Sequence, residues 1–203
     1  MIKLKIKDNL FRKWRVNRRP SNQLMMIWLK QTLEQHQSLD RAVDIGCGKG
    51  INRSYFLNPQ YTGLDVNPVF TKVAQERYPA DEFGILDVSE QDPPEGDLFV
   101  ATLVFHNKFF PKDKVVESVE RIVSKVRSGG CFVFTTGEIN QSDYPALNAF
   151  LNTRFASVRI YSYGRFNSPS YGSIPLAYMM NFWPKLAEAP RNRMRFWVCS
   201  QKL

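Results

Sequence analysis

Apolar and polar positions along the chain form two kinds of pattern. Short continuous apolar runs, such as RAVDIG at 41–46, predict strands that are covered on both faces of a sheet. Elsewhere apolar residues recur every three or four positions, most clearly over 113–127, which predicts amphipathic helices. Strands are expected at 41–46, 61–66, 82–88, 97–105, 131–137, 157–164 and 194–201. Helices are expected at 21–36, 51–58, 68–78, 113–127 and 143–153.

Local signals mark two helix ends. Asn67 is a predicted N-cap, and Pro68 follows at the first helical position, where its missing N–H removes no hydrogen bond. Gly129 and Gly130 are expected to end the helix over 113–127.

The order of the elements predicts the fold class. Strand and helix alternate five times, which is typical of an α/β fold with a doubly wound parallel sheet and helices on both faces. A chain of 203 residues is long enough for one domain with a full core. No apolar run is long enough for a membrane span, and the three cysteines form no metal or disulfide pattern. With no secretory signal visible, we expect a cytoplasmic protein.

The net charge of +9 is concentrated at the two ends. Residues 1–20 and residues 154–203 each hold eight Lys or Arg and one acidic residue, whereas residues 21–153 are mildly acidic. Such ends are either solvated surface or, where the fold brings them together, a rim that attracts an anionic ligand. Both interpretations stay open at the level of the sequence.

Three alternating glycines follow the first predicted strand, in VDIGCGKG at 43–50. Ligands of parallel sheets bind beyond the carboxyl ends of the strands, so this turn is a candidate site. A dinucleotide-binding fingerprint requires glycine where the chain has Ile51, and a phosphate-binding P-loop requires Ser or Thr where Gly50 follows Lys49. The remaining pattern is D-x-G-x-G-x-G, at Asp44, Gly46, Gly48 and Gly50.

Acidic residues end the next two predicted strands, at Asp65 and Asp87. A carboxylate accepts two hydrogen bonds and can take both hydroxyls of a ribose, and a second one can accept from the exocyclic amine of adenine. Each acid alone is equally well an N-cap or a loop residue. Their joint placement after the glycine turn favours a ligand site.

This combination resembles the class I S-adenosylmethionine-dependent methyltransferases over about residues 40–137. The resemblance implies one domain over 1–203, with a mostly parallel, seven-stranded Rossmann-like sheet whose last strand is antiparallel. A basic N-terminal cap is expected at 1–38. The C-terminal part, 138–203, is expected to hold a lid or acceptor insertion at 164–192.

The resemblance also assigns a cofactor site. It implies S-adenosyl-L-methionine as the cofactor, with the glycine turn beside its methionine part, Asp65 on the ribose hydroxyls and Asp87 on the adenine amine. Asp44 is expected near the cofactor's amino group. The implied cofactor contacts are Asp44, Gly46, Cys47, Gly48, Gly50, Asp65, Val66, Asp87, Val88 and Leu103.

The loop after the fourth predicted strand is the place for acceptor chemistry. Methyl transfer needs a well-positioned nucleophile, and a hydroxyl acceptor benefits from a general base. We expect His106 to be that base and Asn107 to position the acceptor, although His106 equally well lines the cofactor pocket or simply packs there. The loop has neither the [DN]-P-P-[YFW] motif of amino-group methyltransferases nor an acidic cluster. It therefore favours O-methylation without a metal.

Three functions remain open from the sequence. The first is methyl transfer to a small, anionic acceptor, which aromatic and basic residues over 155–183 would suit. The second is an RNA or protein methyltransferase, less favoured because the chain has no appended RNA-binding module. The third is a non-catalytic domain that binds the cofactor or a partner protein.

Overall fold

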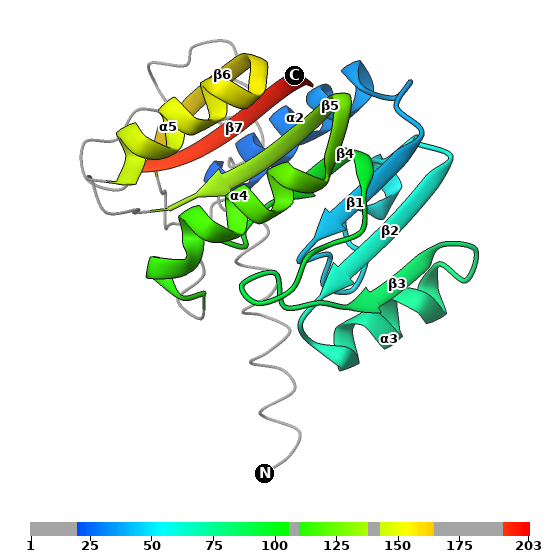
Figure 1. Cartoon of the computed structure of the whole chain (residues 1–203). Helices are drawn as coiled ribbons and strands as arrows, with labels where there is room; N and C mark the ends of the chain where they lie inside the picture. The colour runs from blue at the N-terminus through cyan, green and yellow to red at the C-terminus, as the bar shows by residue number, and fades with distance from the viewer. Residues whose placement is uncertain (1–19, 106–109, 138–142, 165–192) are drawn as a thin grey trace. The chain divides into compact units, whose positions relative to one another are not determined.

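The computed structural model describes residues 20–105, 110–137, 143–164 and 193–203 (Figure 1). The chain divides into two compact units, residues 1–31 with 162–194 and residues 32–161 with 195–203. Most of the sheet lies in the second unit. Half of the predicted cap and nearly all of the predicted insertion lie outside the described residues, so the single-domain organisation stays a prediction. Within the described residues, no helix is both long and apolar enough to cross a bilayer.

Seven strands form one sheet in the order β3-β2-β1-β4-β5-β7-β6. They are β1 (Arg41–Ile45), β2 (Gln60–Asp65), β3 (Glu82–Ile85), β4 (Gly96–Ala101), β5 (Val126–Thr136), β6 (Phe155–Gly164) and β7 (Arg193–Lys202). Neighbours from β3 through β5 pair in parallel, whereas β7 runs antiparallel to β5. The predicted seven-stranded, mostly parallel α/β sheet is confirmed.

The helices also follow the predicted order. They are α2 (Pro20–Gln35), α3 (Pro68–Arg77), α4 (Val115–Lys125) and α5 (Asp143–Arg154), with short 3-10 turns at Arg53–Tyr55 and Lys112–Lys114. The capping signal of α3 is confirmed, because the Asn67 side chain accepts a 3.0 Å hydrogen bond from the N–H of Val69 and Pro68 is the first helical residue. The helix expected over 51–58 is reduced to the first of the two 3-10 turns.

Gly129 and Gly130 lie inside β5 and do not end α4, so that prediction is wrong. β5 already begins at Val126, which pairs with Gly96 of β4. A Cβ added at Gly130 would lie 2.6 Å from the carbonyl oxygen of Asp97. The close approach of the two strands therefore requires this glycine.

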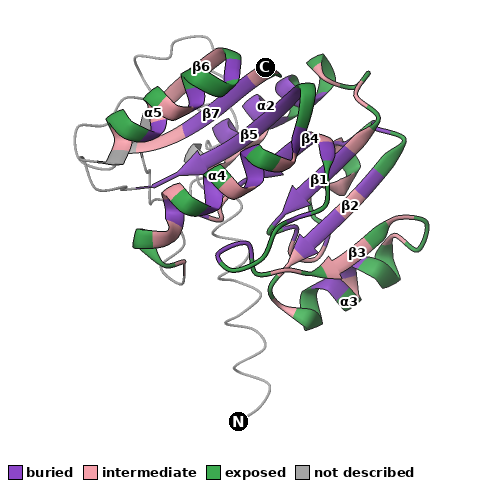
Figure 2. Ribbon diagram, in the orientation of Figure 1, coloured by how far each residue is buried: buried purple, intermediate pink, exposed green. Residues whose placement is uncertain are grey.

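A continuous apolar core lies under α4 and α5, which cover β4, β5 and β7 on one face (Figures 1 and 2). Phe134 and Trp197 stack at its centre with their ring centroids 5.3 Å apart, and neither side chain is exposed to solvent. Burial of one such side chain contributes about 1.5–3 kcal/mol. This packing makes the sheet a rigid base for the loops at its carboxyl edge.

Candidate ligand site at the carboxyl edge of the sheet

The loops after β1 and β4 border the point where the strand order reverses. The chain runs from β1 to β2 and β3 on one side, and then returns to β4 on the other side of β1. Such a switch point is where open α/β sheets bind ligands. The two loops meet closely, because a Cβ added at Gly46 would lie 2.5 Å from Cγ2 of Val104.

The glycine turn leaves part of its backbone open. All three glycines have left-handed φ angles, +70° at Gly46, +56° at Gly48 and +68° at Gly50. The N–H groups of Gly46 and Cys47 both donate to the carbonyl oxygen of Leu64, at 2.7 and 3.0 Å, which ties the turn to β2. A Cβ added at Gly48 would meet no heavy atom within 4 Å. A ligand can therefore approach the backbone at Gly48 closely.

Asp65 is held by backbone N–H groups at the end of β2. Its Oδ2 accepts from the N–H of Gly48 at 2.9 Å, and its Oδ1 accepts from the N–H of Asn67 at 2.8 Å. The carboxylate is half-buried. Each carboxylate oxygen can accept a further hydrogen bond, so the group stays available to a ligand that carries hydroxyls.

Asp44 is the buried acid of the site, with 1% of its surface exposed. Its Oδ2 accepts a 3.0 Å hydrogen bond from the hydroxyl of Tyr61, while its Oδ1 has no hydrogen-bond partner among the described residues. Burial raises the pKa of Asp44 to about 7; the hydrogen bond from Tyr61 opposes this shift, and the charge of Asp65 adds to it. An ammonium group brought to Oδ1 would satisfy this orphaned acceptor.

Tyr61 is in turn fixed from its other side. The guanidinium of Arg53 lies over the Tyr61 ring, 4.8 Å from its centroid, and pairs with both carboxylate oxygens of Asp81 at 2.6 and 2.8 Å. The sequence analysis missed Tyr61 and Arg53. Their role depends on the β1–β2 register, in which Tyr61 pairs with Ala42, and no local motif marks it.

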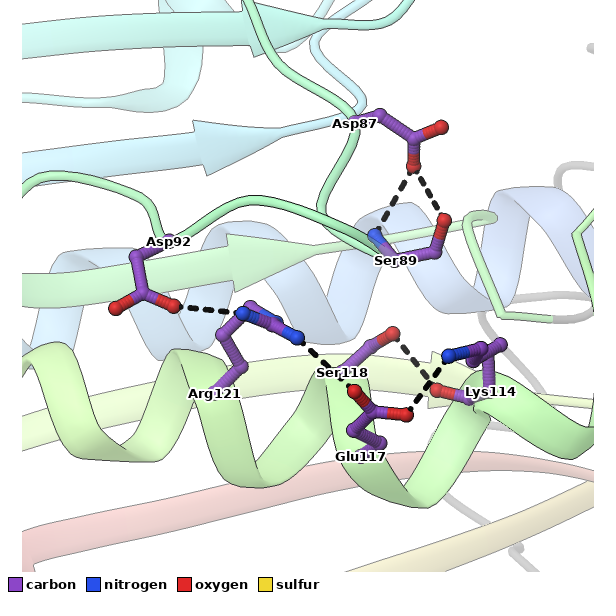
Figure 3. Close-up of polar contacts among 7 residues, drawn as sticks. All are labelled: Asp87, Ser89, Asp92, Lys114, Glu117, Ser118 and Arg121. Atoms are coloured by element: carbon purple, nitrogen blue, oxygen red, sulfur yellow. Dashed lines mark hydrogen bonds and ion pairs between the residues drawn. The ribbon is translucent and has the colours of Figure 1, made fainter.

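Asp87 lies two residues beyond the end of β3, which stops at Ile85 and not near Asp87 as expected. Oδ1 of Asp87 accepts from the N–H of Ser89 at 3.0 Å and from its hydroxyl at 2.6 Å (Figure 3). Its Oδ2 accepts no hydrogen bond from the described residues. At the far end of the same loop, Asp92 pairs with Arg121 of α4 at 2.9 Å. The loop thus presents one free carboxylate oxygen from an anchored backbone.

Two exposed apolar side chains lie next to Asp65, one in the chain and one in the strand register. Val66 and Ile85 are 62% and 63% exposed, and Ile85 stands opposite Asp65 in the β2–β3 register. Further exposed apolar side chains nearby in the chain are Ile51, Val69 and Phe70. The side chain of Val88, by contrast, is buried in the core. The sequence analysis missed Ile85, which its strand pattern gave no reason to separate from the core.

The structure describes two of the four remaining predicted site residues, Leu103 and Cys47. Leu103 has a φ of +62°, an unusual conformation for a residue other than glycine, and its N–H donates to Oγ1 of Thr135 at 2.8 Å. Cys47 is buried, and burial raises the pKa of its thiol, so this thiol is neutral. His106 and Asn107 lie outside the described residues. Within the described residues no group of three or more His, Cys, Asp or Glu is placed to hold a metal, and metal-free catalysis stays a prediction.

These features together fit one kind of ligand. Two carboxylates with free acceptor capacity suit ribose hydroxyls and a base amine, the exposed apolar side chains suit a planar ring, and the orphaned oxygen of Asp44 suits an ammonium. The open backbone at Gly48 leaves room for the segment that joins these groups.

Comparisons with known proteins find similarity to methyltransferases. A family model described as "Methyltransferase domain" matches residues 43–132. No curated protein matches the chain. The N-methyltransferase NodS from Bradyrhizobium japonicum WM9, solved with S-adenosyl-L-homocysteine, is 14% identical with a TM-score of 0.61, over 93% of this chain and 91% of that one. A TehB-like SAM-dependent methyltransferase from Corynebacterium glutamicum is 14% identical with a TM-score of 0.58, over 96% and 97%.

A third solved structure is that of the plantazolicin methyltransferase BpumL in complex with SAH. It is 16% identical, with a TM-score of 0.59, over 98% of this chain and 90% of that one. At such identities the three structures establish a shared fold.

Proposed function

We propose that the chain is a class I S-adenosylmethionine-dependent methyltransferase that methylates a hydroxyl oxygen of a small, anionic acceptor; the methyltransferase-domain match over residues 43–132 and the shared fold support this proposal. The observation that best supports binding of the methyl donor is the position of the Asp65 carboxylate. The N–H of Gly48 holds this carboxylate near the switch point of the sheet. When bound, the cofactor supplies an electrophilic methyl group on a sulfonium sulfur. The tasks left to the protein are to bind this donor, to orient the acceptor and to remove a proton.

Four residues bind the adenosine part of the donor in this proposal. Asp65 takes the ribose hydroxyls, and Oδ2 of Asp87 takes the adenine amine. Val66 and Ile85 contact the faces of the base, because their exposed side chains flank both acids. Burial of these side chains by the base adds hydrophobic stabilisation to the hydrogen bonds.

Asp44 provides the charge for the amino group of the donor. Its Oδ1 is buried and has no hydrogen-bond partner among the described residues, so a cation beside it restores a favourable interaction for the ionised carboxylate. The hydroxyl of Tyr61 keeps the other carboxylate oxygen occupied. The open space beside Gly48 leaves room for the part of the donor that joins its amino group to the ribose.

Arg195 is the residue that would bind the anionic group of the acceptor in this proposal. It lies near the start of β7, paired in register with Thr136 at the end of β5, and therefore at the carboxyl edge. Its guanidinium lies 4.0 Å from the ring centroid of Tyr144 and joins no ion pair among the described residues. A half-buried cation positioned by an aromatic ring suits a carboxylate or phosphate on the acceptor.

His106 and Asn107 complete the acceptor side in this proposal. The imidazole of His106 takes the proton of the acceptor hydroxyl, and the side-chain amide of Asn107 orients the acceptor. An amine acceptor is the second candidate, because NodS, which shares the fold, is described as an N-methyltransferase. The cytoplasmic location stays a prediction.

The direct test is transfer of a labelled methyl group. The full chain is incubated with methyl-labelled S-adenosyl-L-methionine and with separate small-molecule, RNA and protein fractions of a cell extract. We expect label in the small-molecule fraction, in a compound retained on an anion exchanger, and mass spectrometry then separates O-methyl from N-methyl products. Label in RNA or protein would reject the acceptor class. Cofactor binding without any transfer would support a non-catalytic domain.

A further inference from the structure

A polar cavity of about 460 Å³ opens at the opposite, amino edge of the sheet. Its walls come from the segment between α2 and β1 and from β5, β6 and β7. Apart from Leu39 and Gly129 every lining residue has a polar side chain, among them His36, Ser38, Ser157, Arg159 and Ser200. All of them belong to the same compact unit. None of them borders the glycine turn, so this cavity is separate from the methyl-donor site.

The charge of the cavity has one sign. Arg159 of β6 is its only Lys or Arg, and no Asp or Glu is among the lining residues. Its guanidinium is exposed and joins no ion pair among the described residues. The charge of Arg159 also affects the nearby Cys131 thiol. Burial raises the pKa of this thiol to about 12, whereas a hydrogen bond with Ser200 and the charge of Arg159 lower it. An exposed guanidinium beside several hydroxyls favours an oxyanion as ligand.

His36 and Ser200 form an oriented pair in the wall. The carbonyl oxygen of Thr32 can only accept, so Nδ1 of His36 donates to it at 2.8 Å. The other ring nitrogen, Nε2, then lies 3.3 Å from Oγ of Ser200. This arrangement fixes the imidazole and places a hydroxyl at the cavity surface.

The backbone of the same wall is unusual. Gln201 follows Ser200 in β7 with a φ of +59°, the left-handed region that residues other than glycine rarely adopt. Such conformations persist where the surrounding structure holds them, and they are frequent at binding sites. The cavity therefore combines a strained backbone, an oriented hydroxyl and a cation that has no ion-pair partner among the described residues.

We propose that this cavity is a second binding site, for a small oxyanion-bearing metabolite with a phosphate or carboxylate group. The guanidinium of Arg159 binds the anion, and the hydroxyls of Ser38 and Ser157 supply further donors. The volume lies within the usual range of about 300–1,000 Å³ for small-molecule sites. This site would let the enzyme bind an anion at the edge of the sheet opposite the methyl donor, and it does not depend on the nature of the acceptor.

The test is a titration of the isotope-labelled full chain, followed by the amide signals of Ser38, Gly129, Ser157 and Ser200. The probes are inorganic phosphate, citrate and neutral glycerol. We expect saturable shifts at these amides with phosphate or citrate, and none with glycerol; whichever anion binds more tightly identifies the group. Absence of saturable shifts with both anions, or shifts that glycerol reproduces, would overturn the proposal.

Substitutions then assign the site to its residues. Arg159→Gln should weaken anion binding about tenfold or more, and Ser157→Ala less. Arg127→Gln is the matched control, because Arg127 is also an exposed arginine, near the start of β5, but does not line the cavity. Equal weakening by Arg127→Gln would show charge attraction without a site and overturn the proposal. Unchanged thermal stability of the variants confirms that they are folded. A single-stranded RNA oligonucleotide that shifts these amides at lower concentration than either anion would also overturn it.

Discussion

The N–H of Gly48 donates to Oδ2 of Asp65 across 2.9 Å, so the turn after β1 and the acid after β2 are one structural unit. The two residues contribute in different ways. Gly48 provides a backbone that a ligand can approach, and Asp65 provides a carboxylate whose orientation that backbone fixes. A substitution at either residue is therefore expected to weaken cofactor binding, because each residue holds the other in place.

Asp65→Asn should weaken cofactor binding by roughly 10- to 100-fold. The substitution replaces charge-assisted hydrogen bonds, each worth about 1.5–3 kcal/mol, by neutral ones, and one amide nitrogen faces a backbone N–H. Isothermal titration calorimetry with S-adenosyl-L-homocysteine measures the loss. Asp92→Asn is the control, because Asp92 pairs with α4 on the surface and should leave the affinity unchanged. Wild-type affinity in Asp65→Asn would reject this donor site.

Gly48→Ala should affect ligand binding more than folding. Alanine at φ +56° costs about 1–2 kcal/mol of stability, and its methyl group occupies the open space beside the turn. Gly129→Ala is a close match, since Gly129 also has a left-handed φ, +78°, and open space around it. We expect similar falls in the free energy of unfolding and lost cofactor affinity only for Gly48→Ala. Equal affinities for both variants would place the ligand elsewhere.

Cofactor affinity should rise with pH through the titration of Asp44. The pKa of this acid in the free protein is about 7, and only the ionised form attracts the cofactor's ammonium. Affinity should therefore increase by roughly tenfold between about pH 5.5 and about pH 7. Calorimetry at several pH values checks this. Asp44→Asn should bind weakly at every pH, and a persistent rise in that variant would assign the titration to another group.

The same acid should make the free protein less stable as pH rises. Its pKa is about 7 in the folded state and 3.8 as the reference, so the folded state keeps a proton that the unfolded state loses between these values. The free energy of unfolding should fall over that range and then level off. Asp44→Asn should recover about 2–4 kcal/mol at pH 8, measured by urea denaturation. A difference from wild type that does not change between pH 4 and pH 8 would contradict the buried acid.

Arg195→Gln should raise KM for an anionic acceptor about tenfold and leave the cofactor affinity unchanged, because the guanidinium binds only the acceptor in this proposal. His106→Ala should instead lower kcat by about 100-fold or more with an O-acceptor. Steady-state kinetics with the identified acceptor separates the two effects. Near-normal turnover in His106→Ala would reject His106 as the base.

Sequence reasoning was most successful where a signal is local. Asn67 followed by Pro68 predicts the start of α3, and the alternating glycines predict a turn open to a ligand at Gly48, because each depends on neighbouring backbone angles. Gly130 was misassigned, because the reason for this glycine is a carbonyl oxygen on β4 and not the end of a helix. Likewise, Tyr61 reaches Asp44 only through the strand register, which the sequence does not specify.

Gly46 and Val104 stand far apart in the chain, yet a single added carbon at the first would lie 2.5 Å from the side chain of the second. The left-handed φ of +70° already disfavours any side chain at Gly46, and the contact adds a steric limit at residue 104. In descent, both positions should therefore be restricted, position 46 to glycine and position 104 to a side chain about as small as valine. A homologue with a larger residue at 104 would need a different path for the loop after β4. The binding properties of that loop would change with its path.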